Sequence, residues 1–298
     1  MISRIFRALA ELPATLRLAA KPRVIMTLLV KNEEQLLELN LRFHKAMGVE
    51  GFIITDNNST DGTREIIRRY QERGWVLAVI DEPGEDYRQQ AWVDRMVEMA
   101  RRDFSADWII NADADEFWYA PSGSLQQEVT GVRANVLQCE VVGMRPLEGV
   151  PLTEWNETVH EAPKEADFDL SPYSIFSHQT YKVMHRAAGY LRISMGNHKV
   201  KMLPRWKRRS EIAVFHFNLR EKEAFLKKMI NGGEQLARNP RKRGGRHWRY
   251  FYALHLEGRL EAEYDRVIGT HCLEKLKACG AVRTDNRFKD FWKNLKEE

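Results

Sequence analysis

The first 120 residues repeat one pattern, in which a short apolar run is followed by a polar turn and an amphipathic segment. The apolar runs are rich in strand-forming residues, and the segments between them carry apolar side chains at helical spacing. The four runs are residues 24–30, 51–55, 75–80 and 108–110. Strands that alternate with helices predict a parallel sheet with right-handed crossovers. We therefore expect an α/β fold.

Polar residues follow each of these runs. They are Lys31 and Asn32 after the first, Asp56 after the second, Asp81 after the third, and Asp113 with Asp115 after the fourth. In parallel sheets, ligands bind beyond the carboxyl ends of the strands. The pattern therefore predicts one site at this edge of the sheet. We also expect Asn32 to cap the helix that follows it.

The run after the fourth strand is acidic. Asp113, Asp115 and Glu116 follow directly on Trp108-Ile109-Ile110. Three carboxylates at such spacing repel one another unless a cation lies among them. A divalent metal that also holds a phosphate-bearing substrate explains this cluster.

Composition narrows the class of protein. The hydrophobic content of 43% is too high for a disordered chain, and the formal net charge of +5 favours anionic partners only mildly. Cys139, Cys272 and Cys279 lack metal-ligand spacing, and their odd number argues against a disulfide framework. We expect thiols in a reducing compartment, in agreement with a cytoplasmic location. No stretch approaches the roughly 20 apolar residues of a membrane span.

The N-terminal segment, residues 1–21, is amphipathic. One helical face, flanked by arginines, carries Ile2, Ile5, Phe6 and Leu9. Arg7 and Glu11 interrupt any continuous signal-peptide core, so we do not expect secretion. Two interpretations stay open: the face contacts an anionic membrane surface from the cytoplasmic side, or it packs on its own domain.

Three motifs occur in the order and spacing seen in glycosyltransferase family 2, which the chain therefore resembles. They are Val30-Lys31-Asn32-Glu33-Glu34, Asp56-Asn57-Asn58-Ser59-Thr60-Asp61-Gly62-Thr63 and Asp113-Ala114-Asp115. Gly196-Asn197-His198 and Phe215-His216-Phe217-Asn218-Leu219-Arg220 resemble motifs of a bacterial subgroup. The resemblance covers about residues 22–120, is weaker to 230, and ends there. It implies the GT-A nucleotide-diphospho-sugar transferase fold, with a mostly parallel central sheet and flanking helices.

The resemblance also implies roles for single residues. Lys31, Asn32 and Glu33 line up with the first nucleotide-binding loop, and Asp56 resembles the carboxylate that binds the base. Asp113 and Asp115 resemble the ribose and metal contacts, with Mn²⁺ or Mg²⁺ held directly by the second aspartate. His216 resembles a further metal ligand, and Arg220 is a candidate cation for the diphosphate. Asp61, Gly62 and Thr63 are typical of a turn and a helix start.

The catalytic base is the least determined part of the site. An inverting transferase needs a group that takes the proton from the acceptor hydroxyl. The candidates are His198 and four carboxylates of one loop-rich stretch, namely Glu154, Glu157, Asp167 and Asp169. Each of these residues also has an ordinary interpretation as a solvated loop residue.

The rest of the chain suggests three parts. They are an amphipathic segment at 1–21, a catalytic domain at 22–220 with a nucleotide-binding half (22–120) and an acceptor half (121–220), and a helical extension at 221–298. Two basic clusters, at 199–209 and 238–249, are either solvated faces or contacts for an anionic membrane or polysaccharide. We expect no nucleic-acid partner, because no recognition motif is visible.

These observations predict a metal-dependent glycosyltransferase that is inverting. It would move a sugar from a nucleotide-diphospho-sugar to a glycan or glycolipid acceptor, in bacterial surface polysaccharide biosynthesis. A non-catalytic module that binds glycans or anionic surfaces is one alternative, and a metal-dependent phosphohydrolase is another. Phosphohydrolases of the haloacid dehalogenase type carry Asp-x-Asp at their first strand, whereas here it follows the fourth and continues with Glu116-Phe117.

Overall fold

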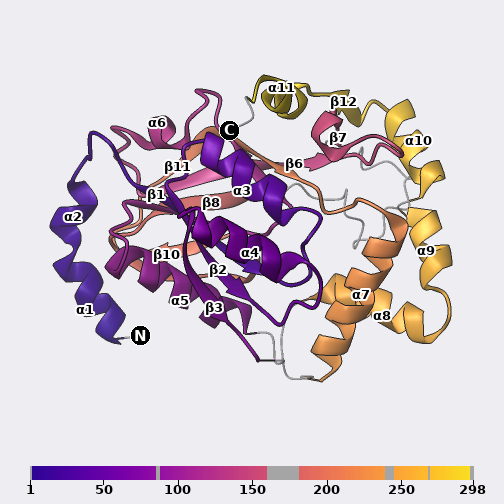
Figure 1. Ribbon diagram of the computed structural model, residues 1–298, viewed down its shortest axis with the longest axis horizontal. Coiled ribbons are helices and arrows are strands. Elements are labelled where there is room, and N and C mark those ends of the chain that lie inside the picture. Colours follow the sequence, from indigo (N-terminus) through magenta and orange to yellow (C-terminus); the bar gives the residue numbers. More distant parts are fainter. Residues whose placement is uncertain (1, 85–87, 160–180, 239–244, 268, 296–298) are drawn as a thin grey trace. The chain divides into compact units, whose positions relative to one another are not determined.

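The computed structural model describes residues 2–84, 88–159, 181–238, 245–267 and 269–295. These residues form two compact units, whose helices and strands are labelled in Figure 1. The first unit contains residues 2–84, 88–141 and 181–214, and the second contains residues 142–159, 215–238, 245–267 and 269–295. The division into 1–21, 22–220 and 221–298 stays a prediction.

Four parallel strands form the centre of the first unit, as the alternating pattern predicted. They are β1 (Val24–Val30), β2 (Gly51–Asp56), β3 (Val76–Asp81) and β4 (Trp108–Ala112), in the spatial order β4-β1-β2-β3. Every residue of β2 and β4 is buried. Strands covered on both faces are apolar along most of their length, which is what the sequence runs indicated. The predicted α/β fold class is confirmed.

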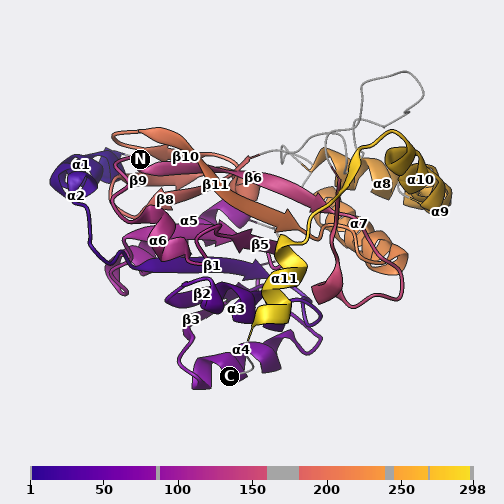
Figure 2. The same ribbon diagram turned by 90° about the horizontal axis from the view of Figure 1, so that it is seen from above.

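Helices cover both faces of these strands. They are α3 (Leu37–Ala46), α4 (Thr63–Glu72) and α5 (Gln89–Arg102). Figure 2 shows α5 on one side of β1 and β2, and α3 with α4 on the other. Met96 and Val97 of α5 share one core with Ile25 of β1, Ile53 of β2 and Ile109 of β4. The apolar face of α5 therefore holds three neighbouring strands together.

Antiparallel strands continue the sheet beyond β4. β8 (Tyr181–Arg186) pairs antiparallel with β4 and with β6 (Val136–Met144), while β11 (Lys207–His216) pairs with β6 and β5 (Glu116–Tyr119). A separate two-stranded sheet contains β9 (Tyr190–Ile193) and β10 (Val200–Met202). The strands predicted near 136–142 and 199–202 are confirmed. The sequence pattern did not predict β5, β8, β9 or β11. The first three are short and contain a charged residue, and β11 begins with three residues of the basic cluster at 199–209.

A line of buried hydrogen bonds joins β1, β4 and β8. Thr27 Oγ1 donates to Asn111 Oδ1 at 2.7 Å, and Asn111 Nδ2 lies 3.0 Å from Nε2 of His185. Nδ1 of His185 lies 2.9 Å from the carbonyl of Arg186, so the ring proton is on Nδ1 and Nε2 accepts. Because buried polar groups need partners, this line specifies which strand lies beside β4.

Short helices complete the first unit. They are α1 (Ile2–Ala10), α2 (Leu12–Leu16), α6 (Leu125–Val129) and the 3₁₀ turn η2 (Met195–Asn197). The side chain of Ser124 caps α6 by accepting from the Gln127 amide at 3.3 Å. Within the described residues, no helix combines the length and the apolar character that a membrane span requires.

The second unit combines a small antiparallel sheet with helices. Its strands are the end of β6, β7 (Glu157–Val159) and β12 (Val282–Thr284), and η1 (Leu152–Glu154) is a 3₁₀ turn. Its helices are α7 (Lys222–Ala237), α8 (Arg246–Leu256), α9 (Leu260–Val267), α10 (Thr270–Ala278) and α11 (Arg287–Asn294). At Gly233, α7 and α8 approach so closely that a Cβ atom would lie 2.2 Å from Cβ of Tyr252. The predicted helices are confirmed, whereas β12 was not predicted because it has a single apolar residue.

We expect the free energy of unfolding to fall steeply as the pH drops from 6.5 towards 4. Burial lowers the pKa of His44 to about 3 and that of His185 to about 4. The unfolded chain therefore binds protons that the folded chain excludes, at about 1.4 kcal/mol per pH unit for each histidine. Urea unfolding followed by circular dichroism at several pH values measures this slope.

His185→Gln should reduce the slope by about half, because one of two buried neutral histidines is removed. The matched control is His255→Gln, since His255 is exposed on α8. An unchanged slope in His185→Gln would contradict the assignment of His185 as a buried neutral group.

Candidate functional site

The carboxyl ends of the four parallel strands lie side by side, as predicted. The register places Val30 beside Asp56, and Asp56 beside Asp81. Ala112, the last residue of β4, pairs with Leu28 on the other side of β1. The polar residues that follow these ends therefore come together at one edge of the sheet.

The loops after β1 and β2 are tied to each other by hydrogen bonds. Asn32 Oδ1 accepts from the Thr60 amide at 2.8 Å, and the Asn32 amide donates to Ser59 Oγ at 2.9 Å. The Glu33 amide donates to Thr63 Oγ1 at 2.8 Å. Asn32 and Glu33 thus join the two predicted nucleotide-binding loops into one frame, beside the exposed Lys31.

Asn32 does not cap the helix that follows, so this prediction was wrong. Helix α3 begins at Leu37, and the residue at its N-cap is Leu36. Asn32 has a φ of 56° and turns the chain several residues before the helix starts. Its side chain bonds to the neighbouring loop instead of to the first turn of α3. Asp61 has the structural role predicted for it, because it accepts from the Thr63 amide at 3.0 Å.

The Asp56 carboxylate is buried and already has partners. It accepts from the Ser59 hydroxyl at 2.5 Å and from Nε of Arg64 at 2.8 Å. Arg64 also forms an ion pair with Asp81, so one guanidinium bridges the ends of β2 and β3. The Arg64 side chain is 54% exposed, and it is therefore the solvent-facing cover of Asp56.

Helix α3 holds the backbone of the acidic turn. Asn40 Nδ2 donates to the carbonyls of Ala114 and Glu116 at 3.0 and 2.9 Å. Nε2 of His44 accepts from the Trp118 amide at 2.9 Å. Asn40 and His44 are both fully buried. Two side chains from one helix thus fix the chain on both sides of Asp115.

A buried lysine lies among the acidic side chains. Nζ of Lys182, on β8, is 2.5 Å from Glu116 Oε1 and 3.7 Å from Asp113 Oδ2. Burial alone would lower the pKa of Lys182, but attraction by Glu116, and then by Asp113, raises it above its ordinary value. Lys182 is therefore a permanent ammonium ion inside the cluster.

The cluster fits a divalent cation. Asp115 and Glu116 are buried, and each offers a carboxylate oxygen within 4.8 Å of the other. Asp113 is more open, with 38% of its side chain exposed. Three carboxylates around one ammonium leave two negative charges, and hard oxygen ligands suit Mg²⁺ or Mn²⁺. Glu116 was not among the predicted ligands.

The turn that contains His198 is linked to the same lysine. Lys182 Nζ donates to the carbonyl of Gly196 at 2.7 Å. His198 Nδ1 lies 3.2 Å from the carbonyl of Tyr181, and because a carbonyl oxygen only accepts, Nδ1 donates in this contact. Asn197 is buried with a φ of 59°, and its Oδ1 has no hydrogen-bond partner among the described residues. His198 and Asn197 therefore lie on a turn that Lys182 joins to the acidic cluster.

Other predicted residues belong to the second unit. Glu157 lies in β7 and forms an ion pair with Arg145. His216 is the last residue of β11, and Arg220 precedes α7. The roles assigned to these three residues stay predictions. Glu154 lies in η1, and Asp167 and Asp169 lie outside the described residues.

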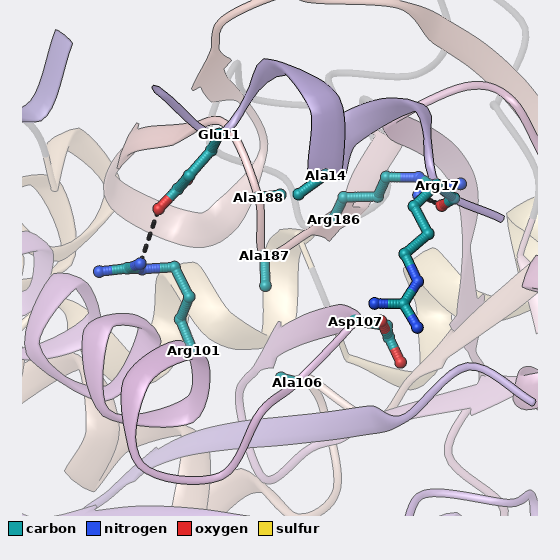
Figure 3. A pocket seen from close by; sticks show the side chains of 9 residues that line it. All are labelled: Glu11, Ala14, Arg17, Arg101, Ala106, Asp107, Arg186, Ala187 and Ala188. Carbon is teal, nitrogen blue, oxygen red and sulfur yellow. Dashed lines mark hydrogen bonds and ion pairs between the residues drawn. The ribbon is translucent and has the colours of Figure 1, made fainter. Parts of the chain in front are cut away.

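A hollow of about 230 Å³ lies elsewhere in the first unit (Figure 3). Its lining includes Asp107 and Arg186. Asp107 precedes the first residue of β4, so this hollow is at the amino ends of the parallel strands. Figure 3 shows Glu11 pointing at Arg101, with which it forms an ion pair of 2.7 Å. The hollow is thus separate from the acidic cluster, and its charges hold the N-terminal segment.

Asn40, Arg64 and Lys182 were not predicted from the sequence. Asn40 interrupts the apolar face of its helix between Leu36 and Phe43, and a polar residue in such a face needs a buried partner. The sequence alone could therefore have indicated that Asn40 makes a buried hydrogen bond. Lys182 stands in Tyr181–Arg186, where only two consecutive residues, Val183 and Met184, are aliphatic, so the sequence shows no periodic pattern of a buried strand. Its burial follows only from the two strands that flank β8.

We expect Lys182→Met to lower the free energy of unfolding by about 3–5 kcal/mol, because Glu116 would be left buried without its cation. Glu116→Gln alone removes the opposite partner. In the double variant neither of the two side chains is charged, so no buried charge is left without a partner. Its loss of free energy of unfolding should therefore be well below the sum of the two single losses. Urea unfolding of the four proteins measures this coupling. Additive losses would contradict a direct ion pair.

The sequence profile of Glycosyl transferase family 2 matches residues 29–187. A comparison with curated proteins gave no match. Among solved structures, the chain is similar to a mannosyltransferase, PcManGT from Pyrobaculum calidifontis in complex with GDP-Man and Mn²⁺. The TM-score is 0.42 at 15% identity, over 93% of this chain and 81% of that one. For S. aureus TarS, residues 1–349, the TM-score is 0.40 at 12% identity, over 91% and 90% of the two chains.

The matched region contains both nucleotide-loop candidates, the acidic turn and Lys182. The mixed α/β arrangement of the first unit agrees with the GT-A fold that the resemblance implied. The match favours a transferase over a phosphohydrolase and over a non-catalytic binding module. Because it spans more than half of the 298 residues, the chain belongs to glycosyl transferase family 2, a family of sugar-transferring enzymes.

Proposed function

We propose that this glycosyltransferase moves a sugar from a nucleotide-diphospho-sugar to a hydroxyl of a glycan or glycolipid, with a divalent metal, Mn²⁺ or Mg²⁺, as cofactor. One observation carries the proposal. The acidic cluster Asp113, Asp115 and Glu116 lies at the end of β4, and Lys182 neutralises only part of its charge. A cation shared between these carboxylates and an anionic diphosphate would complete the neutralisation.

The nucleotide would bind across the loops of β1 and β2. Asp56 would accept a hydrogen bond from the base, while Lys31, Asn32 and Glu33 would line the loop above β1. Because Asp56 is covered by the exposed Arg64, its carboxylate would become accessible if that guanidinium turned into solvent. The hydrogen bonds between the two loops support a preorganised binding site, in which the loops hold the same positions before and after the nucleotide binds.

The leaving diphosphate would be held at the acidic cluster. Asp115 would ligate the metal directly, with Asp113 and Glu116 beside it, His216 as a further ligand and Arg220 as a cation on the phosphates. When bound, the metal would stabilise the negative charge that the diphosphate gains as the sugar leaves. Lys182 would keep Glu116 charged and fixed in place, since Lys182 Nζ lies 2.5 Å from Oε1 of Glu116.

An inverting reaction needs a base for the acceptor hydroxyl. His198 is the stronger candidate, because its Nδ1 bonds to the carbonyl of Tyr181 and orients the ring, and Lys182 joins its turn to the acidic cluster. Glu157 is the second candidate, but its ion pair with Arg145 would have to open first. Asn197 Oδ1, buried beside His198, would accept from a hydroxyl of the donor sugar or the acceptor.

We also propose that the reaction belongs to bacterial surface polysaccharide synthesis and takes place on the cytoplasmic side of the membrane, since a glycan or glycolipid acceptor would fit that role. A glycolipid acceptor would lie in a membrane, so a peripheral contact with an anionic membrane is part of this proposal. No nucleic-acid partner is proposed.

A thermal-shift screen of UDP-, GDP- and TDP-sugars, each with and without Mn²⁺, tests the donor and the metal together. A bound ligand raises the apparent stability by mass action, by about 2.7 kcal/mol at a concentration of about 100 times its dissociation constant. The expected result is a shift with one nucleotide class that increases with Mn²⁺. Absence of a shift with every sugar nucleotide would overturn the proposal.

Asp115→Ala should reduce turnover by at least about a thousandfold and remove the Mn²⁺-dependent part of the thermal shift, because the metal loses its direct ligand. Circular dichroism should show an intact fold. Asp103→Ala is the matched control, since Asp103 is an exposed carboxylate just after α5. Normal Mn²⁺ dependence in Asp115→Ala would move the metal site elsewhere.

Asp56→Asn should weaken nucleotide binding roughly tenfold or more while leaving the Mn²⁺ dependence in place, because a charge-assisted hydrogen bond to the base becomes a neutral one. Isothermal titration with the free nucleoside, which lacks the diphosphate, isolates this contact. Equal affinity of the variant and the unmodified protein for the nucleoside would show that Asp56 does not bind the base.

A further inference from the structure

Helix α1 is attached to the first unit by its arginines. Arg4 and Arg7 each pair with a carboxylate of α5 and also donate to a backbone carbonyl of β9. The contacts are Arg4 with Asp94 and the Leu191 carbonyl, both at 2.8 Å, and Arg7 with Glu98 at 2.7 Å and the Tyr190 carbonyl at 2.8 Å. In α1, therefore, the charged side chains point inward. This reverses the expectation that they flank an outward face.

The apolar side chains of the same segment point outward. Ile5, Leu9, Leu12 and Leu16 follow one another at helical spacing, and all four are exposed. Phe6 is 68% and Leu16 64% exposed, and Leu18 continues the same surface. Six of the eleven exposed large apolar side chains in the described part of the chain thus lie between residues 5 and 18. We call Ile5, Phe6, Leu9, Leu12, Leu16 and Leu18 the N-terminal apolar face.

The size of this face argues against a stable dimer. Its exposed fractions correspond to roughly 500 Å² of surface, if a large apolar side chain offers roughly 180 Å². A stable protein interface buries roughly 800 Å² on each partner. The face is nevertheless as large as the patches of roughly 300–600 Å² that carry function on monomeric proteins.

The charges around the face favour an anionic partner. Glu11 is the only acid among residues 1–21, and its carboxylate is turned inward to Arg101 at 2.7 Å (Figure 3). Arg17 and Lys21 are exposed at the end of the segment. On β9 and β10, next to α1, the exposed Arg192 and Lys201 lie opposite each other. Apolar side chains bordered by cations are what an anionic bilayer surface binds.

We propose that the N-terminal apolar face lies on an anionic lipid bilayer, with Phe6 and Leu16 among the acyl chains and Arg17 and Lys21 at the headgroups. This inference deepens the membrane contact in the proposed function and rests on that part alone. Sugar transfer is not needed for it. The ion pairs of Arg4 and Arg7 would keep α1 on the first unit while its outer face is in the bilayer.

Co-sedimentation of the full chain with vesicles tests the proposal, using phosphatidylcholine alone and phosphatidylcholine mixed with phosphatidylglycerol. We expect binding to the mixed vesicles, and binding at least about tenfold weaker for the double variant Phe6→Ser, Leu16→Ser. Leu256→Ser is the matched control, because Leu256 is 70% exposed on α8 and should leave binding unchanged. Arg17→Gln with Lys21→Gln should weaken binding roughly tenfold, to the mixed vesicles only.

Equal vesicle binding by the unmodified protein and the Phe6/Leu16 double variant would overturn the proposal, and so would no binding at all. Sedimentation velocity without lipid gives a further check. A dimer that the double variant abolishes would assign the face to a second copy of the chain. The double variant should keep the nucleotide-sugar thermal shift, so failure of the donor screen and failure of membrane binding are separate results.

Discussion

The buried ion pair between Glu116 and Lys182 is the constraint around which the first unit is organised. A carboxylate with no exposure at the end of a strand is tolerable only beside a cation. That cation comes from β8, whose register with β4 pairs Ile110 with Met184. A slip of one residue would turn Lys182 to the opposite face of the sheet. The hydrogen bond from Asn111 to His185 opposes such a slip, so the polar line and the ion pair specify the same register.

The donor side of the site is fixed in a different way. Its two loops hold each other through backbone amides and short polar side chains, chiefly at Asn32 and Ser59. Such bonds leave little freedom to lose when a nucleotide binds, which favours affinity. Arg64 is the exception, because its long side chain covers Asp56 from the solvent side. The site therefore combines a rigid frame with one movable cover.

The sequence predicted what depends on local pattern. Strand runs, the helices between them and the edge of the sheet that carries Asp56 and Asp113 all followed from periodicity and from the rule on strand ends. It failed where the position of a residue depends on a contact with a residue that is distant in the sequence. The helix start at Leu37 instead of after Asn32 depends on a bond to the next loop, and the burial of Lys182 depends on strands that flank it only in the folded chain. Arg64 could not be found either, since eight positions and a helix start separate it from the carboxylate that it covers.

The inward arginines of α1 give the N-terminal segment an unusual dependence on its surroundings. The bonds that fasten it to α5 are ion pairs in direct contact and partly buried, and dissolved salt screens such pairs only weakly. The attraction of the exposed Arg17 and Lys21 to anionic headgroups acts over a longer distance, and salt weakens it. Ionic strength therefore acts on the contact with an anionic surface and spares the contact between α1 and α5. In concentrated salt, the segment would stay folded on the first unit and bind a bilayer through its apolar side chains alone.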